Sequence, residues 1–542
     1  MIKLFNSLTT GITDLFFVLM FTVYLFGLLG HSYENIMEIK YILFLLICGG
    51  YCLIMAFLCF QRSVLFPGQR LSREAGETFS GPLFRLERLF FFFVILYMCF
   101  TILSALLSEY GIAVTLAGTE RKEGALCIAI YCLVGIFTAR FYRPALWHHY
   151  LFSLALLLFC AVAILQFFGW NPLELYPEGY NYYDKYVHYG GAFLSTMGNV
   201  GLVSAFLSIA VPFSAVCSAR LWRMRRLEED EICEMKGDSA ENEVALKSAG
   251  MEKKGRLFGW LRSVSYEKKI AAAALLSAAA AFCGAAVLLY SGVLAGILGV
   301  IGSAALFLPA VAGFDRKKTA AWFIVLSFSA AAFISFVYCN DGLSLPVREP
   351  AEEQSSSEET YRVGGEDSLR QKDETSYPRA LCELHELLHG NFDDSFGTGR
   401  IHIYRNVLHL VPEHLYFGGG PDTLCLRDTE DFRRYDTKRK LWIETHIDSA
   451  HSEYLNILVN QGLFALTAYL GIIVCAALFL LKSRSAKKRW NENGFRLACG
   501  AAAVSWLIQA LFGISMYISE PYFWMILGML FYLPSRDASR RF

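Results

Sequence analysis

Long apolar runs, separated by shorter polar stretches, make up most of the chain. A bilayer core needs about 20 apolar residues per helix. Twelve stretches meet or approach that length: 11–31, 41–60, 89–108, 124–139, 150–169, 196–216, 269–289, 291–312, 319–338, 453–481, 496–515 and 521–534. The pattern therefore predicts an all-α polytopic membrane protein with about twelve transmembrane helices.

Lysine and arginine concentrate in alternate loops between these runs. The basic loops are 62–88, 140–143, 220–269, 316–318 and 482–496, and the end of the chain is also basic. The short loops between them carry few basic residues, namely Lys40, Arg121, Lys122 and Lys185. Because cytoplasmic loops are enriched in Lys and Arg, we expect both termini in the cytoplasm and the protein in the cell (inner, or cytoplasmic) membrane.

The spans and two long polar stretches divide the chain into five parts. These are spans one to six (1–217), a cytoplasmic loop (218–268), spans seven to nine (269–338), an extracytoplasmic loop between spans nine and ten (339–450), and spans ten to twelve with a cytoplasmic tail (451–542). In the extracytoplasmic loop, 349–377 is rich in Ser, Glu and Gly and is predicted to be disordered. The remainder, 378–450, alternates amphipathic segments with Gly-Pro turns, which predicts a folded lid.

Composition narrows the function. Of 542 residues, 55% are apolar and 18% are charged, against about 25% charged residues in soluble domains. Mean hydropathy is +0.40 and the net charge is zero, which excludes a soluble enzyme, a disordered chain and a nucleic-acid binder. The predicted span interiors contain essentially no ionisable residues, and this argues against an ion-driven transporter.

The first candidate for chemistry is an arginine-led segment in the lid. Residues 396–425 read FGTGRIHIYRNVLHLVPEHLYFGGGPDTLC. Apolar residues at helical spacing place Arg400 at the start of an amphipathic helix, with Arg405 on the following turn. A guanidinium there can bind an anion, or it can pair with a local carboxylate such as Asp393 or Asp394.

A glycine-rich turn follows this predicted helix. The sequence GGGPDT, residues 418–423, forms a tight turn whose backbone amides can face an anion. Gly420 and Asp422 are its candidate binding residues. The alternative is that the segment serves only as a turn.

The second candidate is a histidine at the start of the tenth span. Residues 446–470 read HIDSAHSEYLNILVNQGLFALTAYL. If the helix begins at Asp448, then His451 lies in its first turn and shares a face with Asp448 and Tyr454. With an ordinary pKa of about 6.5, an imidazole can act as a base near neutral pH. Asp448 can orient it, or Glu453 can approach it, unless the histidine only caps the helix.

Three motifs together resemble one family. The blocks IDSAHSEYLNILVNQGLFALTAYL and GRIHIYRNVLHLVPEHLYFGGGPDT resemble the bacterial O-antigen ligase and O-antigen polymerase family. A third block, STMGNVGLVSAFLSIAVP at 195–212, is similar to the Gly-Asn turn that the family places before a span. Asn199 in that turn is a weaker candidate, because helix capping explains it equally well. The order of the motifs, about twelve spans and the large outer loop also match.

The resemblance implies an integral-membrane glycosyltransferase that works on the extracytoplasmic face. Such proteins pass a glycan from a polyprenyl-diphosphate carrier to a hydroxyl on a lipid, a glycan or a protein, without a nucleotide sugar, a metal or another cofactor. By resemblance, His451 is the base or the residue that orients the acceptor, and Arg400 binds the diphosphate, which a guanidinium can hold bidentately. The supporting substrate-binding candidates are Arg405, Tyr454, Asp448, Glu453, Gly420, Asp422 and Asn199.

One departure from the family concerns a second arginine. Many relatives carry it at the outer start of the eighth span, where this chain reads LYSGVLAG and Gly292 follows Ser291. Either Arg405, Arg439 or Lys440 takes its place, or carrier binding differs, or catalysis has been lost.

Four functions fit the sequence. Ligase-like transfer is favoured because the His-Glu-Tyr-Leu block resembles that branch, and a polysaccharide polymerase is the sister alternative. A transporter or flippase of lipid-linked glycans and a membrane scaffold belong to different classes. The enzyme interpretation requires Arg400 and His451, which come from separate segments, to face one site.

Overall fold

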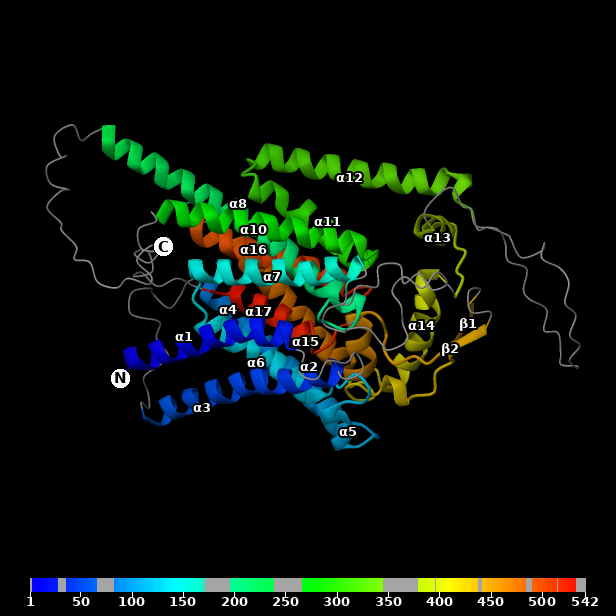
Figure 1. The fold of residues 1–542 in the computed structure, drawn as a ribbon. Coiled ribbons are helices and arrows are strands. Elements are labelled where there is room, and N and C mark those ends of the chain that lie inside the picture. Colours follow the sequence, from blue (N-terminus) through cyan, green and yellow to red (C-terminus); the bar gives the residue numbers. More distant parts are fainter. Residues whose placement is uncertain are drawn as a thin grey trace, which may run out of the picture.

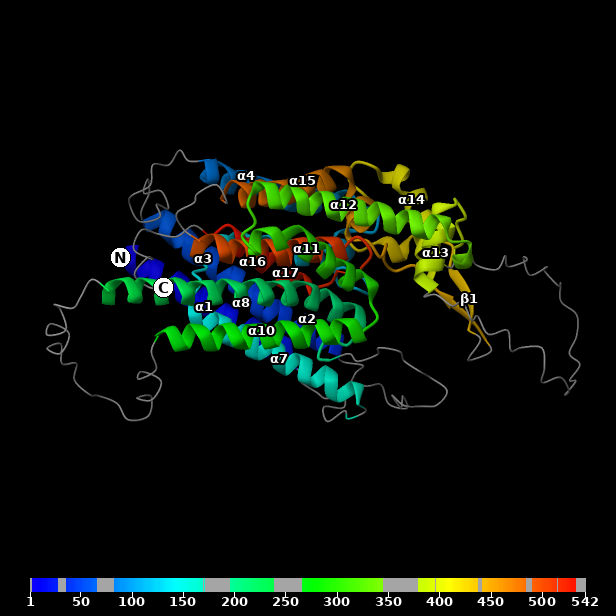
Figure 2. The same cartoon turned by 90° about the horizontal axis from the view of Figure 1, so that it is seen from above.

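The computed structural model is a bundle of long helices with a small extramembrane part at one end (Figures 1 and 2). It describes residues 2–27, 36–65, 82–168, 170, 195–237, 266–344, 379–394, 396–436, 441–483, 490–513 and 515–532. The predicted disordered segment 349–377 lies outside these residues, as do Lys440 and Arg439.

The bundle helices are α1 (Ile2–Leu19), α2 (Ile36–Phe44), α3 (Gly50–Leu65), α4 (Pro82–Leu107), α5 (Ile112–Ala117), α6 (Ala125–Phe141), α7 (Leu146–Phe167), α8 (Val200–Gly237), α10 (Tyr266–Tyr290), α11 (Leu294–Val311), α12 (Arg316–Cys339), α15 (Glu453–Ser483), α16 (Trp490–Gln509) and α17 (Glu520–Leu530). Two π-helical turns, Met20–Tyr24 and Leu45–Gly49, extend α1 and join α2 to α3.

The lid contains α13 (Arg379–Leu388), α14 (Phe396–Leu410) and a hairpin of β1 (Phe432–Asp436) and β2 (Leu441–Thr445). The two strands are antiparallel, with Phe432 opposite Thr445. Short 3₁₀ turns at Asp341–Leu343, Val411–His414 and Leu424–Leu426 complete the connections.

The predicted membrane class is confirmed. Within the described residues, nine helices are long and apolar enough to cross a bilayer. Each matches one of the predicted spans, and α6, α16 and α17 occupy the other three predicted ranges. Because these three helices do not meet the same criteria of length and composition, the count of twelve stays a prediction.

The described ends of the basic loops lie at the end of the bundle opposite the lid (Figure 1). The Arg62 guanidinium lies 4.8 Å from the ring centre of Phe5, near the start of α1. Arg496 donates a 2.9 Å hydrogen bond to the carbonyl of Tyr532, just beyond α17, and the Arg143 guanidinium lies 5.7 Å from the ring centre of Tyr532. Loops that the charge pattern assigns to one side of the membrane therefore lie together.

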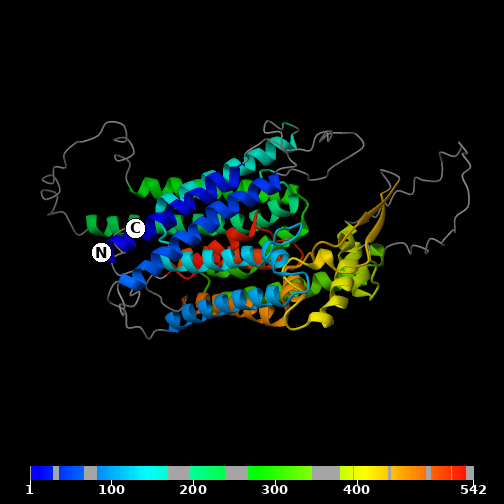
Figure 3. The same ribbon diagram turned by 90° about the horizontal axis from the view of Figure 1, so that it is seen from below.

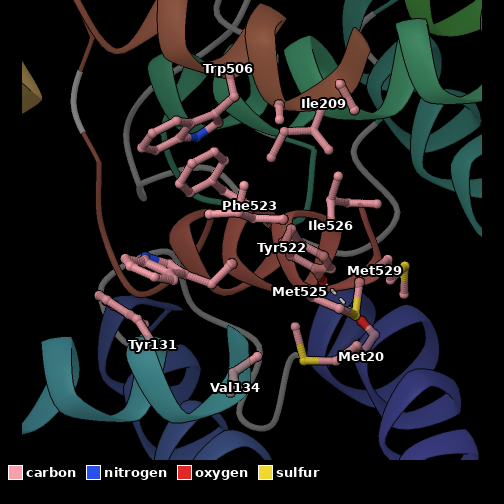
Figure 4. Packing of buried hydrophobic residues seen from close by; sticks show 14 of the residues in the cluster. Met20, Tyr131, Val134, Ile209, Trp506, Tyr522, Phe523, Met525, Ile526 and Met529 are labelled. Carbon is pink, nitrogen blue, oxygen red and sulfur yellow. Dashed lines mark hydrogen bonds between the residues drawn. The ribbon is translucent and has the colours of Figure 1, made fainter. Parts of the chain in front are cut away.

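Helix α17 forms the centre of the bundle, and every one of its residues is buried. Figure 4 shows its side chains meeting residues of α6, α8, α16 and the Met20 turn. Phe523 stacks on Trp506 with ring centres 3.9 Å apart. A Cβ on Gly528 would lie 2.6 Å from the carbonyl oxygen of Gly135 in α6. Such close helix contacts through small residues stabilise bundles in lipid, where apolar surface is not withdrawn from water.

Ionisable side chains do lie within the candidate spans of the described residues, and Lys40 and Asp14 are two of them. The predicted second span starts at 41, whereas the helix starts at Ile36 and so includes the buried Lys40. Lys40 donates to the carbonyl of Leu25 at 2.8 Å, and Asp14 in α1 lies 3.2 Å from His148. Because both groups have partners on neighbouring segments, they tie helices together and do not indicate an ion path.

A break in α15 fixes the lid to the bundle. Gly462 has φ 85° and ψ 178°, a conformation that only glycine adopts readily. The break frees backbone groups on both sides of it, and the segment 415–420 satisfies them. The amide of Leu463 donates to Leu415 at 2.8 Å, and the amide of Gly420 donates to Asn460 at 2.8 Å.

Candidate functional site

His451 lies immediately before α15, in a connection between the lid and the bundle. Its φ of 47° is left-handed, which is uncommon for a residue other than glycine. Its amide donates to the hydroxyl of Ser449 at 3.3 Å, and the hydroxyl of Tyr404 in α14 donates to its carbonyl at 3.4 Å. The backbone is thus held in a strained conformation, as is frequent at functional sites.

The predicted helix start at Asp448 is wrong. Helix α15 begins at Glu453, and the carbonyl of Ser452 accepts its first 2.8 Å hydrogen bond. Ser452 takes the capping position that favours serine. Asp448, His451 and Tyr454 therefore do not share one helix face, although Asp448 still lies beside the histidine.

Three charged side chains act electrostatically on the imidazole of His451. Burial, followed by the charges of Arg121 and Arg400, lowers the pKa of His451 to about 4, and the carboxylate of Asp448 acts in the opposite direction. Arg400 and His451 therefore lie within electrostatic range of each other. The side chain of Arg400 also donates to the carbonyl of Gly397 at 2.8 Å, across the first turn of α14.

Arg121 is the residue that the sequence interpretation did not select. It lies in the connection between α5 and α6, which Figure 3 shows beside the start of α15. Its Nε and one terminal nitrogen donate to the two carboxylate oxygens of Asp448, both at 2.9 Å. The side chain of Arg121 is 15% exposed and that of Asp448 is 34% exposed.

Asp422 positions the loop that carries Arg121. Its Oδ2 accepts the amides of Thr119 at 2.6 Å and Glu123 at 3.2 Å. Burial raises the pKa of Asp422, and these backbone hydrogen bonds oppose that rise. Like that of His451, the backbone of Asp422 has a left-handed conformation, with φ 58°, which aspartate tolerates better than most residues.

Glu123 fixes the far end of the same loop. Its carboxylate accepts the hydroxyl of Tyr131 at 2.8 Å and also accepts the amide of Tyr517. The loop between α5 and α6 is therefore pinned to the lid by Asp422 and to the bundle by Glu123.

The three glycines of the turn do not present free amides to an anion, contrary to the sequence interpretation. The amides of Gly418, Gly419 and Gly420 donate to the carbonyls of His414, Val459 and Asn460 at 2.7, 3.2 and 2.8 Å. The break in α15 leaves two of these carbonyls without helical partners, and the turn supplies their donors. Gly420 thus has a structural contact that the sequence did not indicate.

Arg405 is paired outside the group formed by His451, Arg400 and Arg121. It forms a 3.0 Å ion pair with Asp394, and its side chain is 62% exposed. Arg405 thus pairs with one of the two carboxylates that the sequence offered as alternative partners for Arg400.

The remaining candidates bind backbone groups. The hydroxyl of Tyr454 donates to the carbonyl of Leu507 at 3.0 Å, and the amide of Glu453 donates to that of Ala510 at 2.9 Å, so both residues tie α15 to α16. The side chain of Asn199 accepts the amide of Gly201 at 2.7 Å, which caps α8.

This arrangement places a neutral imidazole beside two guanidinium groups at the lid end of the bundle. A neutral imidazole can accept a proton, and guanidinium groups favour phosphate and carboxylate. Within the described residues, no group of three or more His, Cys, Asp or Glu side chains is placed to hold a metal ion.

Fold and site together define a multi-pass membrane protein with a histidine–arginine group between its helices and an extramembrane lid. Residues 279–470 match the family model described as O-antigen ligase. Residues 279–470 are therefore similar to the O-antigen ligase family, and this stretch includes two of the three motifs that resemble the family, 399–423 and 447–470. Arg400 and His451 lie inside the matched stretch, whereas Arg121 and Asn199 lie outside it. A search of curated proteins finds no match.

Proposed function

We propose that this protein transfers a glycan from a polyprenyl-diphosphate carrier to an acceptor hydroxyl on the extracytoplasmic face, in the manner of an O-antigen ligase. The observation that carries the proposal is that α14, the helix of Arg400, contacts the segment of His451, where the hydroxyl of Tyr404 donates to the His451 carbonyl at 3.4 Å. Arg400 and His451 belong to separate motifs of the matched stretch, and Arg400 acts electrostatically on the imidazole.

In the proposed reaction, the acceptor oxygen forms a bond to the anomeric carbon of the sugar. The bond from that carbon to the phosphate oxygen breaks, and the diphosphate leaves with its polyprenyl chain. His451 takes the proton of the acceptor hydroxyl, and Arg400 stabilises the negative charge that grows on the diphosphate. The exposed apolar sides of the spans offer the polyprenyl chain a lipid-like surface.

Ligase and polymerase differ in the acceptor and share the donor. We favour a ligase because of the His-Glu-Tyr-Leu block, with a lipid, a glycan or a protein as the acceptor. The proposed setting is the inner membrane, with twelve spans and both termini in the cytoplasm. The gathering of basic loops at the end opposite the lid supports this orientation.

The test is transfer of radiolabelled glycan from its lipid carrier in membranes containing the full-length protein. His451→Ala should lower the rate by about 10²–10⁴-fold, and Arg400→Gln should also lower it strongly. His409→Ala is the matched control, because His409 is an exposed histidine of α14 and should transfer normally. Normal transfer by a correctly inserted His451→Ala protein would remove the base from the mechanism. Carrier movement across vesicles without transfer would favour a flippase.

A further inference from the structure

Asp448 occupies the binding geometry that a phosphate would use on Arg121. The carboxylate accepts two parallel hydrogen bonds of 2.9 Å from the guanidinium. A phosphate oxygen pair accepts the same two bonds from arginine, so a carboxylate and a phosphate compete directly for this group.

The two members of this ion pair are held differently. The loop of Arg121 is fixed through the Asp422 carboxylate and through Glu123, and the Arg121 side chain is largely covered. Asp448 lies in a connection without regular structure, and its side chain is about twice as exposed as that of Arg121. An arriving anion therefore meets a largely covered guanidinium whose partner carboxylate is the more exposed of the two groups.

We infer that Arg121 is a second binding group for the diphosphate of the donor, and that Asp448 holds its position in the empty site and is displaced when the donor binds. This inference rests on the proposed function, because it takes the donor to be a diphosphate.

The exchange changes the charges around His451. The charged groups that act on the imidazole are Arg121, Arg400 and Asp448. A bound diphosphate brings negative charge to both guanidinium groups, and the released Asp448 carboxylate no longer has its charge neutralised by Arg121. Each change favours a proton on the imidazole. Binding of the donor thus converts a weak base into a stronger one, so that the acceptor loses its proton only when the donor is in place.

The test is binding of inorganic pyrophosphate to the purified full-length protein, measured by calorimetry. Arg121→Gln should weaken binding by at least about tenfold, and Arg121→Lys should weaken it less, because lysine keeps the charge without the paired hydrogen bonds. Asp448→Asn should tighten binding severalfold, since it removes the competing anion and preserves the side-chain shape. Lys122→Gln, which removes the neighbouring positive charge that pairs with Glu38 at 3.4 Å, is the control and should bind like the native protein.

The inference is decided by the opposite changes in pyrophosphate affinity expected for the Arg121 and Asp448 variants. A purely structural ion pair would make both substitutions weaken binding, and unchanged affinity in Arg121→Gln would also overturn the inference. If Arg121→Gln does not fold, Arg121→Lys and Asp448→Asn still give opposite signs. If the native protein shows no glycan transfer although the pyrophosphate affinities are as expected, the result would count against the proposed function alone. Transfer that depends on His451, with unchanged affinities in both variants, would count against the exchange alone.

Discussion

The acid limit of glycan transfer is a direct test of how the charges around His451 act. A base must be neutral to accept a proton, so the rate falls as the pH drops through its pKa. Burial, Arg121 and Arg400 lower the pKa of His451 to about 4, against the effect of Asp448. Transfer should therefore persist at pH values where an ordinary imidazole is already protonated.

The size of the effect follows from the two pKa values. At about pH 5, an imidazole of ordinary pKa, about 6.5, is roughly 3% neutral. With the pKa of about 4 found for His451, roughly 90% is neutral at the same pH. The value of kcat/KM at pH 5 should thus be about thirtyfold higher than for an unperturbed histidine.

The assay is the initial rate of radiolabelled glycan transfer from about pH 4.5 to about pH 8, at low and at saturating donor. The low-donor series gives kcat/KM and reports the free protein, whereas the saturated rate reports the complex. Arg121→Gln should move the acid limit of kcat/KM to higher pH, and Arg405→Gln should leave it unchanged. At saturating donor, the native limit should also lie at higher pH, because the diphosphate opposes both guanidinium charges.

Two outcomes would refute this reasoning. An acid limit of kcat/KM near pH 6.5 in the native protein would mean that the surroundings of His451 do not lower its pKa. An equal limit in the native protein and Arg121→Gln would mean that Arg121 does not act on the imidazole.

Two further predictions concern the framework of the site. Gly462→Ala should destabilise the protein by at least about 1–3 kcal/mol, because its backbone has a positive φ and a Cβ there would lie 2.3 Å from the carbonyl oxygen of Tyr416. The control is Gly50→Ala, where a Cβ in the helix would meet no neighbouring atom. Thermal unfolding measures the stability of both variants. Asp422→Ala should leave the amides of Thr119 and Glu123 without their acceptor, at a cost of about 1–3 kcal/mol each, and should lower the rate of glycan transfer as Arg121→Gln does. Asp422→Asn should lower the rate less, because asparagine keeps an acceptor oxygen and tolerates the same φ. Equal transfer by the two Asp422 variants would separate this loop from the reaction.

Patterns within short stretches of sequence were sufficient to predict part of the fold and of the candidate site. Apolar runs determine helices wherever a bilayer surrounds them, and each of the twelve predicted ranges contains a helix. The motifs around Arg400 and His451 could be recognised because each is contiguous. The start of α15 was misplaced because Asp448 and Ser452 are both acceptable caps, and Asp448 is engaged by Arg121 instead. The glycine-rich turn was misread because its amide partners are created by the break at Gly462.

Arg121 could not be identified in this way, because its partner lies 327 residues further along the chain. One signal was nevertheless present: basic residues are scarce in the loops on its side of the membrane. A basic residue in a loop that is otherwise poor in Lys and Arg is expected to have a partner nearby in space. Lys40, which is another such exception, is buried and donates to Leu25, and Arg121 is bound to Asp448. Exceptions to the charge pattern therefore indicate buried or paired groups, and Arg121 is the one placed beside the imidazole.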